Sequence, residues 1–207
     1  TFTDFENGEQ WRFDPYGRWG INEDFAIFGR VPIISNKPDS GDRETGIGDI
    51  ALGLELLAYE DIFKYPWLIP HLEVTLGTGD EDKGLGEGDA TFKVGLGAGT
   101  TTDIGETGKQ SIDWAADVAY RTHDDRDNVF SGAASIVWNL NEKFALIAEI
   151  GVNDEKLPGA EDSDYPITML GGMWYGITDA LVARIHVGSV ANSPEDAIIA
   201  LEMDGTF

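Results

Sequence analysis

Histidine is the side chain of this sequence best suited to acid–base chemistry, and the chain holds 3 histidines. His123 precedes Asp124 and Asp125, and His186 stands close to Ser189. Hydrolases use Asp/His and Ser/His groups of this kind to activate water or a hydroxyl. No G-x-S-x-G motif accompanies them, so we predict that the protein is not an enzyme and keep a hydrolase as the third hypothesis.

Acidic residues gather in three segments, and hard cations such as Ca²⁺ prefer carboxylate oxygens. The segments are residues 80–89, 124–127 and 154–164, and none of them matches the full calcium-loop pattern. We therefore expect a solvated acidic rim and no cofactor, with a Ca²⁺ site as the alternative. The residues that could supply ligands to such a site are Asp80, Asp82, Glu87, Asp124, Asp125 and Asp127.

The formal net charge of −24 at pH 7 restricts the partners of the chain. Nucleic acid is excluded as a partner, because phosphate binding needs clustered Lys and Arg. Cations are the expected counterpart. The chain has 0 cysteines, which excludes disulfides and thiolate metal sites and suits an oxidising envelope compartment.

The elements that must position these residues are strands, because hydrophobic and polar residues alternate with a period of two. The segment 50–58 places Ile50, Leu52, Leu54, Leu56 and Ala58 on one face. The opposite face holds Gly53, Glu55 and other small or polar residues. The same division recurs in segments near residues 68–76, 91–98, 112–121 and 144–153.

Alternation alone fits a soluble β-sandwich as well as a membrane barrel. The polar face decides between them, because it is rich in Gly, Ala, Ser and Thr with scattered single charges, as expected of a narrow lumen. No run of 18 apolar residues is present, so strands rather than helices would cross the membrane. We predict an all-β fold, a single transmembrane antiparallel up-and-down β-barrel spanning residues 1–207, in the bacterial outer membrane.

Connections between the strands alternate between short and long, as in outer-membrane barrels with periplasmic turns and external loops. Short turns are predicted at residues 22–24, 60–65, 103–109, 141–143 and 178–179, and longer or more charged loops at residues 35–45, 79–88, 123–128, 154–164 and 191–195. Residues 9–21 would be the first of eleven clear strands. A short strand over residues 1–5 brings the prediction to about twelve, with both termini periplasmic and the first strand closing against the last.

The final strand alternates to the C-terminal residue Phe207, which resembles the assembly signal of bacterial outer-membrane proteins. We expect the chain to be a mature form from which a signal peptide was removed. Aromatic residues near strand ends are predicted to form interfacial girdles: Trp11, Trp19, Phe25, Trp67, Trp138, Phe144 and Tyr175.

If the apolar face meets lipid, the charged residues on the other face line the lumen. They could pair with one another or form rings along an aqueous path. Arg12, Asp14, Tyr16 and Arg18 form one stripe. It could attract anionic groups or neutralise Glu202 and Asp204 across the closing seam, and we expect the second. The complete set of predicted lumen-lining residues is Arg12, Asp14, Arg18, Arg30, Glu55, His71, Glu73, Lys93, Asp113, Asp117, Arg121, Glu149, Arg184, His186, Glu202 and Asp204.

Two glycine-rich motifs carry a family resemblance. Gly46-Ile47-Gly48-Asp49 leads into a strand, and Leu76-Gly77-Thr78-Gly79-Asp80 follows one hairpin later. These motifs resemble the outer-membrane channels grouped under the meta-pathway of phenol degradation. The resemblance implies a channel or transporter for small, often aromatic or apolar compounds. The chain departs from it at Gly77, where the family tends to have proline, and it is shorter than many members.

We therefore predict an outer-membrane, porin-like channel for passive uptake of small molecules or cations. Its expected partners are the lipid bilayer and small solutes, with an envelope protein as a further candidate. The alternative is a structural or surface-interaction barrel with a plugged lumen and cation-binding loops.

Overall fold

The computed structural model describes residues 1–5, 8–56, 67–104, 110–123, 127–154, 165–178, 181–192 and 195–205. The first half of the chain forms short strands: β1 (Phe2–Phe5), β2 (Gly8–Phe13), β3 (Tyr16–Gly20), β4 (Phe25–Arg30), β5 (Ile33–Pro38), β6 (Glu44–Ile47), β7 (Ala51–Leu56) and β8 (Trp67–Thr75). The second half forms longer ones: β9 (Thr91–Ile104), β10 (Gln110–Thr122), β11 (Val129–Asn141), β12 (Phe144–Asn153), β13 (Ile167–Thr178), β14 (Leu181–Ala191) and β15 (Glu195–Gly205).

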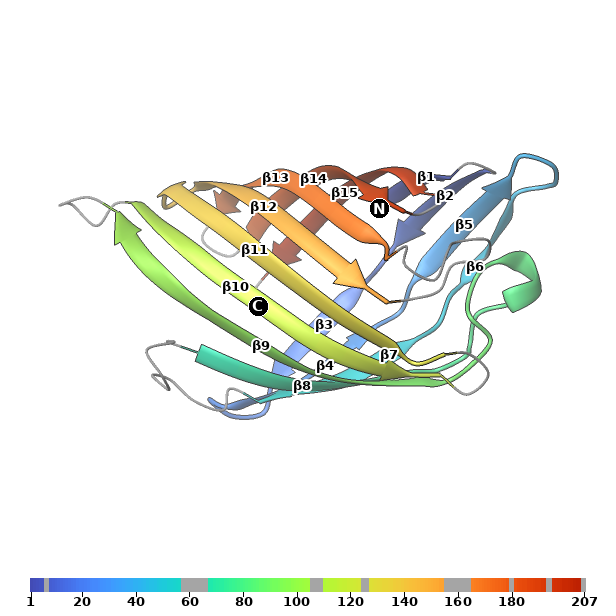
Figure 1. Ribbon diagram of the computed structural model, residues 1–207, viewed down its shortest axis with the longest axis horizontal. Helices are drawn as coiled ribbons and strands as arrows, with labels where there is room; N and C mark the ends of the chain where they lie inside the picture. Colours follow the sequence, from blue (N-terminus) through green and yellow to red (C-terminus); the bar gives the residue numbers. More distant parts are fainter. Residues whose placement is uncertain are drawn as a thin grey trace.

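These strands form one antiparallel sheet of 15 strands that curls around an interior (Figure 1). The order in the sheet is β3-β4-β7-β8-β9-β10-β11-β12-β13-β14-β15-β1-β2-β5-β6. From β7 to β15 each strand pairs with the next along the chain, which is the predicted up-and-down arrangement. As predicted, the first strand meets the last one: β1 pairs with β2 on one side and with β15 on the other.

Three bends divide strands that the sequence predicts as continuous. The bends fall at residues 14–15, 31–32 and 48–50, and two of them contain proline, which cannot donate to a strand ladder. They stay in register with one another, because the Val31 amide donates to the Pro15 carbonyl at 3.1 Å and the Gly48 amide to the Pro32 carbonyl at 2.8 Å. The structure therefore has 15 separate strands where the sequence predicts about twelve.

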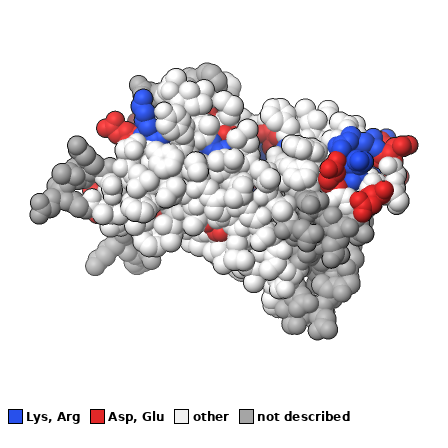
Figure 2. Space-filling view, turned by 90° about the horizontal axis from the view of Figure 1, so that it is seen from above, with Lys and Arg blue, Asp and Glu red and all other residues white. Residues whose placement is uncertain are grey.

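The outer face of the sheet is apolar, as the alternation predicts. Leu52, Leu54 and Leu56 on β7 are all exposed, and so are Val94 and Leu96 on β9 and Val118 on β10. Figure 2 shows that most of this surface between its two ends is uncharged, and that charged side chains gather at the end that carries β5 and β6. Within the described residues, no helix is long and apolar enough to cross a membrane.

The hydrogen-bonded sheet is open, which differs from the predicted closed barrel. Its two edge strands are β3 and β6. Among the described residues, β1 pairs with β2 and β15, and β3 pairs only with β4, so the ladder is not continued from β3 to the other edge. Thr1 lies opposite Arg12, part-way along the wall, and the predicted periplasmic ends and Phe207 lie outside what the described residues can test.

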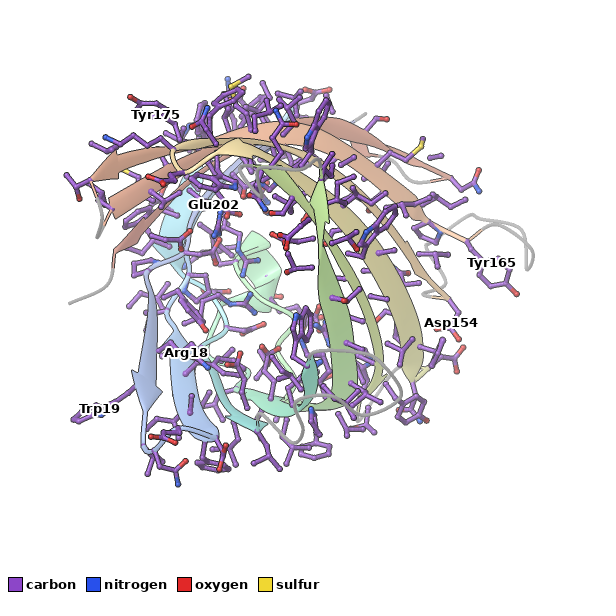
Figure 3. All side chains as sticks on the ribbon, turned by 90° about the vertical axis from the view of Figure 1, so that its left-hand side faces the viewer. Arg18, Trp19, Asp154, Tyr165, Tyr175 and Glu202 are labelled. Carbon is purple, nitrogen blue, oxygen red and sulfur yellow. The ribbon has the colours of Figure 1, made fainter. Side chains whose placement is uncertain are left out.

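A short segment covers one end of the barrel-like sheet. The 3-10 turn η1 (Glu81–Lys83) lies at the right-hand end in Figure 1, and the view along the barrel in Figure 3 shows it across the far mouth. Leu85, which follows it, is only 4% exposed. The predicted loop over residues 79–88 is therefore folded against the sheet.

Candidate functional site

The candidate site is the polar interior of the sheet. Register places inward side chains beside one another, because residues that pair across strands share a face. Glu55 pairs with His71, and Glu73 pairs with Lys93. Large inward side chains lie over glycines of the neighbouring strand. A Cβ at Gly95 would lie 2.2 Å from the His71 ring, so this glycine gives the ring its space.

The first cavity, of about 580 Å³, lies against β4 and β7 to β13. Its wall combines apolar residues such as Phe28, Trp67 and Leu170 with charged ones. His71 Nε2 lies 2.7 Å from Asp117 Oδ2 on this wall. Such a mixed lining can hold a small molecule that has both an apolar body and a polar group.

Beside it, Glu73 is the most deeply placed of the predicted lumen residues, at 6% exposure. Its carboxylate lies 3.3 Å from Lys93 Nζ and 4.0 Å from Arg30 Nη2. Two cations thus offset the cost of removing this carboxylate from water.

A second cavity of about 610 Å³ continues along the interior, and Glu149 and Leu170 line both. His186 Nδ1 lies 3.3 Å from Glu149 Oε2. Asp113 accepts hydrogen bonds from Thr101 Oγ1 at 2.8 Å and from Asn139 Nδ2 at 2.7 Å. Because the two cavities share a wall, polar groups follow one another along most of the interior.

The stripe on the first predicted strand is paired differently from the prediction. Arg12 Nε donates to Asp14 at 2.7 Å, and Arg18 Nε donates to Glu55 at 2.6 Å. Across the seam, Glu202 and Asp204 are bound by Arg184 of the adjacent strand instead, at 3.6 and 2.6 Å. The predicted neutralisation across the seam is therefore wrong, because each wall satisfies its own charges.

The structure also places other residues that the sequence predicts in the lumen or at the interfacial girdles. Arg121 pairs with Lys93 across the ladder between β9 and β10, which gives two cations on one face. Trp67, predicted at an interfacial girdle, lies inward on the wall of the first cavity. Trp11, Trp19, Trp138 and Tyr175 are exposed on the outer face.

The two histidine-based hydrolase candidates do not form a catalytic pair in the described residues. His186 and Ser189 are three positions apart on β14, so they point to opposite faces. The His123 side chain is buried at 3% exposure; its Nδ1 lies 3.1 Å from the Asp127 carbonyl and its Nε2 lies 3.6 Å from Glu87. Its predicted neighbours Asp124 and Asp125 lie outside the described residues.

The acidic loops are partly described. Asp80 and Lys83 form an exposed ion pair at 2.9 Å, and this contact lowers the pKa of Asp80 and raises that of Lys83. Within the part of the chain that the structure describes, no three His, Asp or Glu residues form a group that could hold a metal ion. A Ca²⁺ site at Asp80, Asp82, Glu87 or Asp127 stays a prediction.

Sequence reasoning missed the role of Asp49 and Thr78. Asp49 accepts hydrogen bonds from the amides of Gly79 at 2.8 Å and Glu87 at 2.6 Å. Thr78 Oγ1 donates to the Gly48 carbonyl at 2.9 Å and accepts from the Ile50 amide at 3.0 Å. The two glycine-rich motifs thus form one clasp that holds residues 77–88 over the mouth. Both motifs can be found in the sequence. That they contact each other follows only from the pairing of strands that are distant in the chain.

Comparison with known proteins adds two findings. A solved structure described as an outer membrane channel, from Pseudomonas putida F1, is similar to this chain with a TM-score of 0.62 and 14% identity, over 95% of this chain and 82% of that one. No curated protein matches the chain. The likeness shows the fold, an all-β antiparallel sheet like that of an outer membrane channel, and it agrees with the predicted bacterial outer-membrane location.

One family model matches residues 3–194, which is nearly the whole chain and includes both motifs of the clasp. The resemblance predicted from those motifs is thereby confirmed. The chain belongs to the protein family described as "Putative MetA-pathway of phenol degradation".

Proposed function

We propose that the protein is a passive channel of the outer membrane that admits small solutes and favours cations over anions. The observation that carries this proposal is the pair of adjoining cavities, of about 580 and 610 Å³, inside a sheet whose outer face is apolar. An apolar exterior suits lipid, and adjoining cavities that carry charged and polar side chains suit water and solutes.

The lining of the first cavity suggests which solutes to test. Phe28 and Trp67 offer aromatic surface, while His71 and Lys93 offer polar contacts. Small aromatic compounds that carry a hydroxyl or charged group fit this combination. The family description names phenol degradation, and phenolic compounds are therefore the first solutes to test.

Cation preference is supported by charge. The net charge is −24, and Asp113, Asp117 and Glu149 line the cavities along the interior. Acidic residues near an aqueous path raise the local concentration of cations, and at 0.1 M ionic strength salt screens this effect at distances beyond about 10 Å.

Conductance of the refolded protein in planar bilayers tests the proposal. We expect discrete channels whose reversal potential under a salt gradient indicates cation preference, more strongly at low salt than at high salt. Channels that prefer anions would contradict the role of the acidic residues. Absence of conductance from protein that shows heat-modifiable gel migration would contradict the channel itself.

A second candidate is a barrel whose interior conducts nothing and whose loop end binds cations or an envelope protein. The contact between His71 and Asp117 and the ion pair between Arg184 and Asp204 favour it, because paired polar side chains can fill a lumen. The same bilayer experiment separates the two candidates.

A further inference from the structure

One row of paired residues carries an excess of positive charge into the interior. From β4 to β10, the register joins Phe28, Gly53, Glu73, Lys93 and Arg121 in this order. Residues that pair across strands share a face, and Phe28 and Lys93 both line the first cavity, so the row faces inward. It lies close to the ends of β8 and β10, at the end of the interior that residues 77–88 cover.

The charges of this row do not balance. Lys93 and Arg121 lie directly opposite each other, which is unfavourable for two like charges. The carboxylate of Glu73 lies 3.3 Å from Lys93 Nζ and 4.0 Å from Arg30 Nη2. The Arg121 side chain has no hydrogen bond or ion pair with any residue that the structure describes. Three cations therefore share one carboxylate.

Buried polar atoms at the same place also lack partners among the described residues. Arg30 Nε and Glu73 Oε1 are buried and make no hydrogen bond. The Glu73 side chain is only 7% exposed. A buried polar atom without a partner is costly, and a bound polar group can supply the partner that the protein does not.

Each of the other cations predicted in the lumen has a carboxylate of its own. The pairs are Arg12 with Asp14, Arg18 with Glu55, and Arg184 with Asp204. Asp117, the next acidic residue along β10, lies 2.7 Å from His71. Within the described interior, the excess of positive charge is therefore confined to the row at Lys93 and Arg121, although the chain as a whole carries −24.

We propose that Arg121 and Lys93 form a subsite for the carboxylate of a small aromatic acid. A guanidinium group can bind a carboxylate through two parallel hydrogen bonds, and an ammonium group adds a third. An aromatic body has a surface nearby, because the Phe28 ring lies over Gly53 on the wall of the first cavity. A cavity of about 580 Å³ has room for such a molecule.

This inference rests on the proposed function and deepens it, because it names the class of solute. The acidic residues Asp113 and Glu149 lie elsewhere along the interior and bear on small cations. The subsite instead binds the charged end of one kind of solute, close to the covered mouth.

Binding of radiolabelled benzoate to the refolded chain in micelles tests the subsite by equilibrium dialysis, with empty micelles as the blank. Arg121→Gln should weaken the affinity at least about tenfold, as expected for the loss of one charge-assisted hydrogen bond. Arg121→Lys, which keeps the charge, should retain part of the affinity. Lys37→Gln, at an exposed position of β5, is the matched control and should bind benzoate like the unmodified chain.

Unfolding separates binding from a structural role of Arg121. Because Arg121→Gln removes one member of a like-charge pair, its midpoint of urea unfolding should equal or exceed that of the unmodified chain. Loss of benzoate binding together with loss of stability would show a structural role and overturn the subsite. Unchanged benzoate binding by Arg121→Gln would overturn it as well.

Two further probes separate the charge of the ligand from its ring. Benzamide has nearly the shape of benzoate but no negative charge, so it should bind at least about tenfold more weakly. Acetate keeps the charge without the ring, and it should compete with benzoate at least about tenfold more weakly than unlabelled benzoate does. Equal binding of benzamide overturns the anion subsite, and equal competition by acetate overturns the aromatic class of solute.

Binding in micelles does not depend on conduction, so the subsite and the channel can fail separately. A chain that conducts in planar bilayers but does not bind benzoate keeps the proposed channel and loses the subsite. A chain that binds benzoate but does not conduct keeps the subsite and loses the channel.

Discussion

Asp49 and Gly79 are joined by a hydrogen bond of 2.8 Å from the Gly79 amide to the carboxylate, and this contact connects the two glycine-rich motifs of the chain. The other oxygen of the carboxylate accepts from the amide of Glu87. One side chain therefore holds both ends of the loop that crosses the mouth.

Removal of the clasp should release this loop. A hydrogen bond to a charged group contributes about 1.5–3 kcal/mol, so Asp49→Ala should raise the rate of tryptic cleavage after Lys83 by at least about tenfold. Gel analysis of timed digests measures it. Asp39→Ala, in the neighbouring exposed loop, is the control and should cleave like the unmodified chain. Equal protection of Lys83 in both variants would contradict the clasp.

Asp117 should contribute to ion preference. Asp117→Asn removes one negative charge from the wall of the first cavity and leaves the shape of the side chain nearly unchanged. Since a unit charge about 4 Å away acts with about 1 kcal/mol in water, we expect the cation-to-anion permeability ratio to fall by about two- to fivefold. Reversal potentials measure this ratio. Glu23→Gln, at an exposed turn, should change it less, and an equal fall in both would contradict a role of the cavity wall.

Gly95 should be needed for the position of His71. A Cβ at Gly95 would lie 2.2 Å from the ring and 3.0 Å from the Ala119 Cβ, so Gly95→Ala forces the ring to move. Crowding of this kind costs about 1–3 kcal/mol of stability. We expect a lower midpoint of urea unfolding in micelles, which measures this cost.

The space around other glycines supplies the controls for that experiment. Gly171→Ala should have little effect, because nothing lies within 4 Å of its added Cβ. Adding His71→Ala to Gly95→Ala should recover part of the lost stability. Without such recovery, the contact with His71 is not the cause.

Val118 tests the membrane placement of the outer face. It is 46% exposed and lies on the apolar side of β10. Val118→Arg should destabilise the protein in lipid vesicles by up to about 2–4 kcal/mol, the cost of arginine near the bilayer centre. Ser135→Arg, on the wall of the first cavity, should cost less because its surroundings are polar. A stable monomer of the unmodified chain without detergent would contradict membrane insertion.

Period-two alternation by itself determined which residues face outward, because successive strand residues point to opposite faces wherever the strand lies in the sheet. Leu52, Leu54 and Leu56 follow that prediction, and Glu55 and His71 line the interior. The sequence also determined turns that depend on neighbouring residues alone. The Asn22 side chain, for example, accepts a hydrogen bond of 3.0 Å from the Asp24 amide.

Only the tertiary structure decided which charges meet and how the mouth is covered. Arg18 binds Glu55 from 37 positions away, and Asp49 holds Glu87 from 38 positions away. Such contacts depend on the register between distant strands, which local patterns do not contain. The pattern along one strand shows on which face each residue lies. It does not show which residue of the next strand lies beside it.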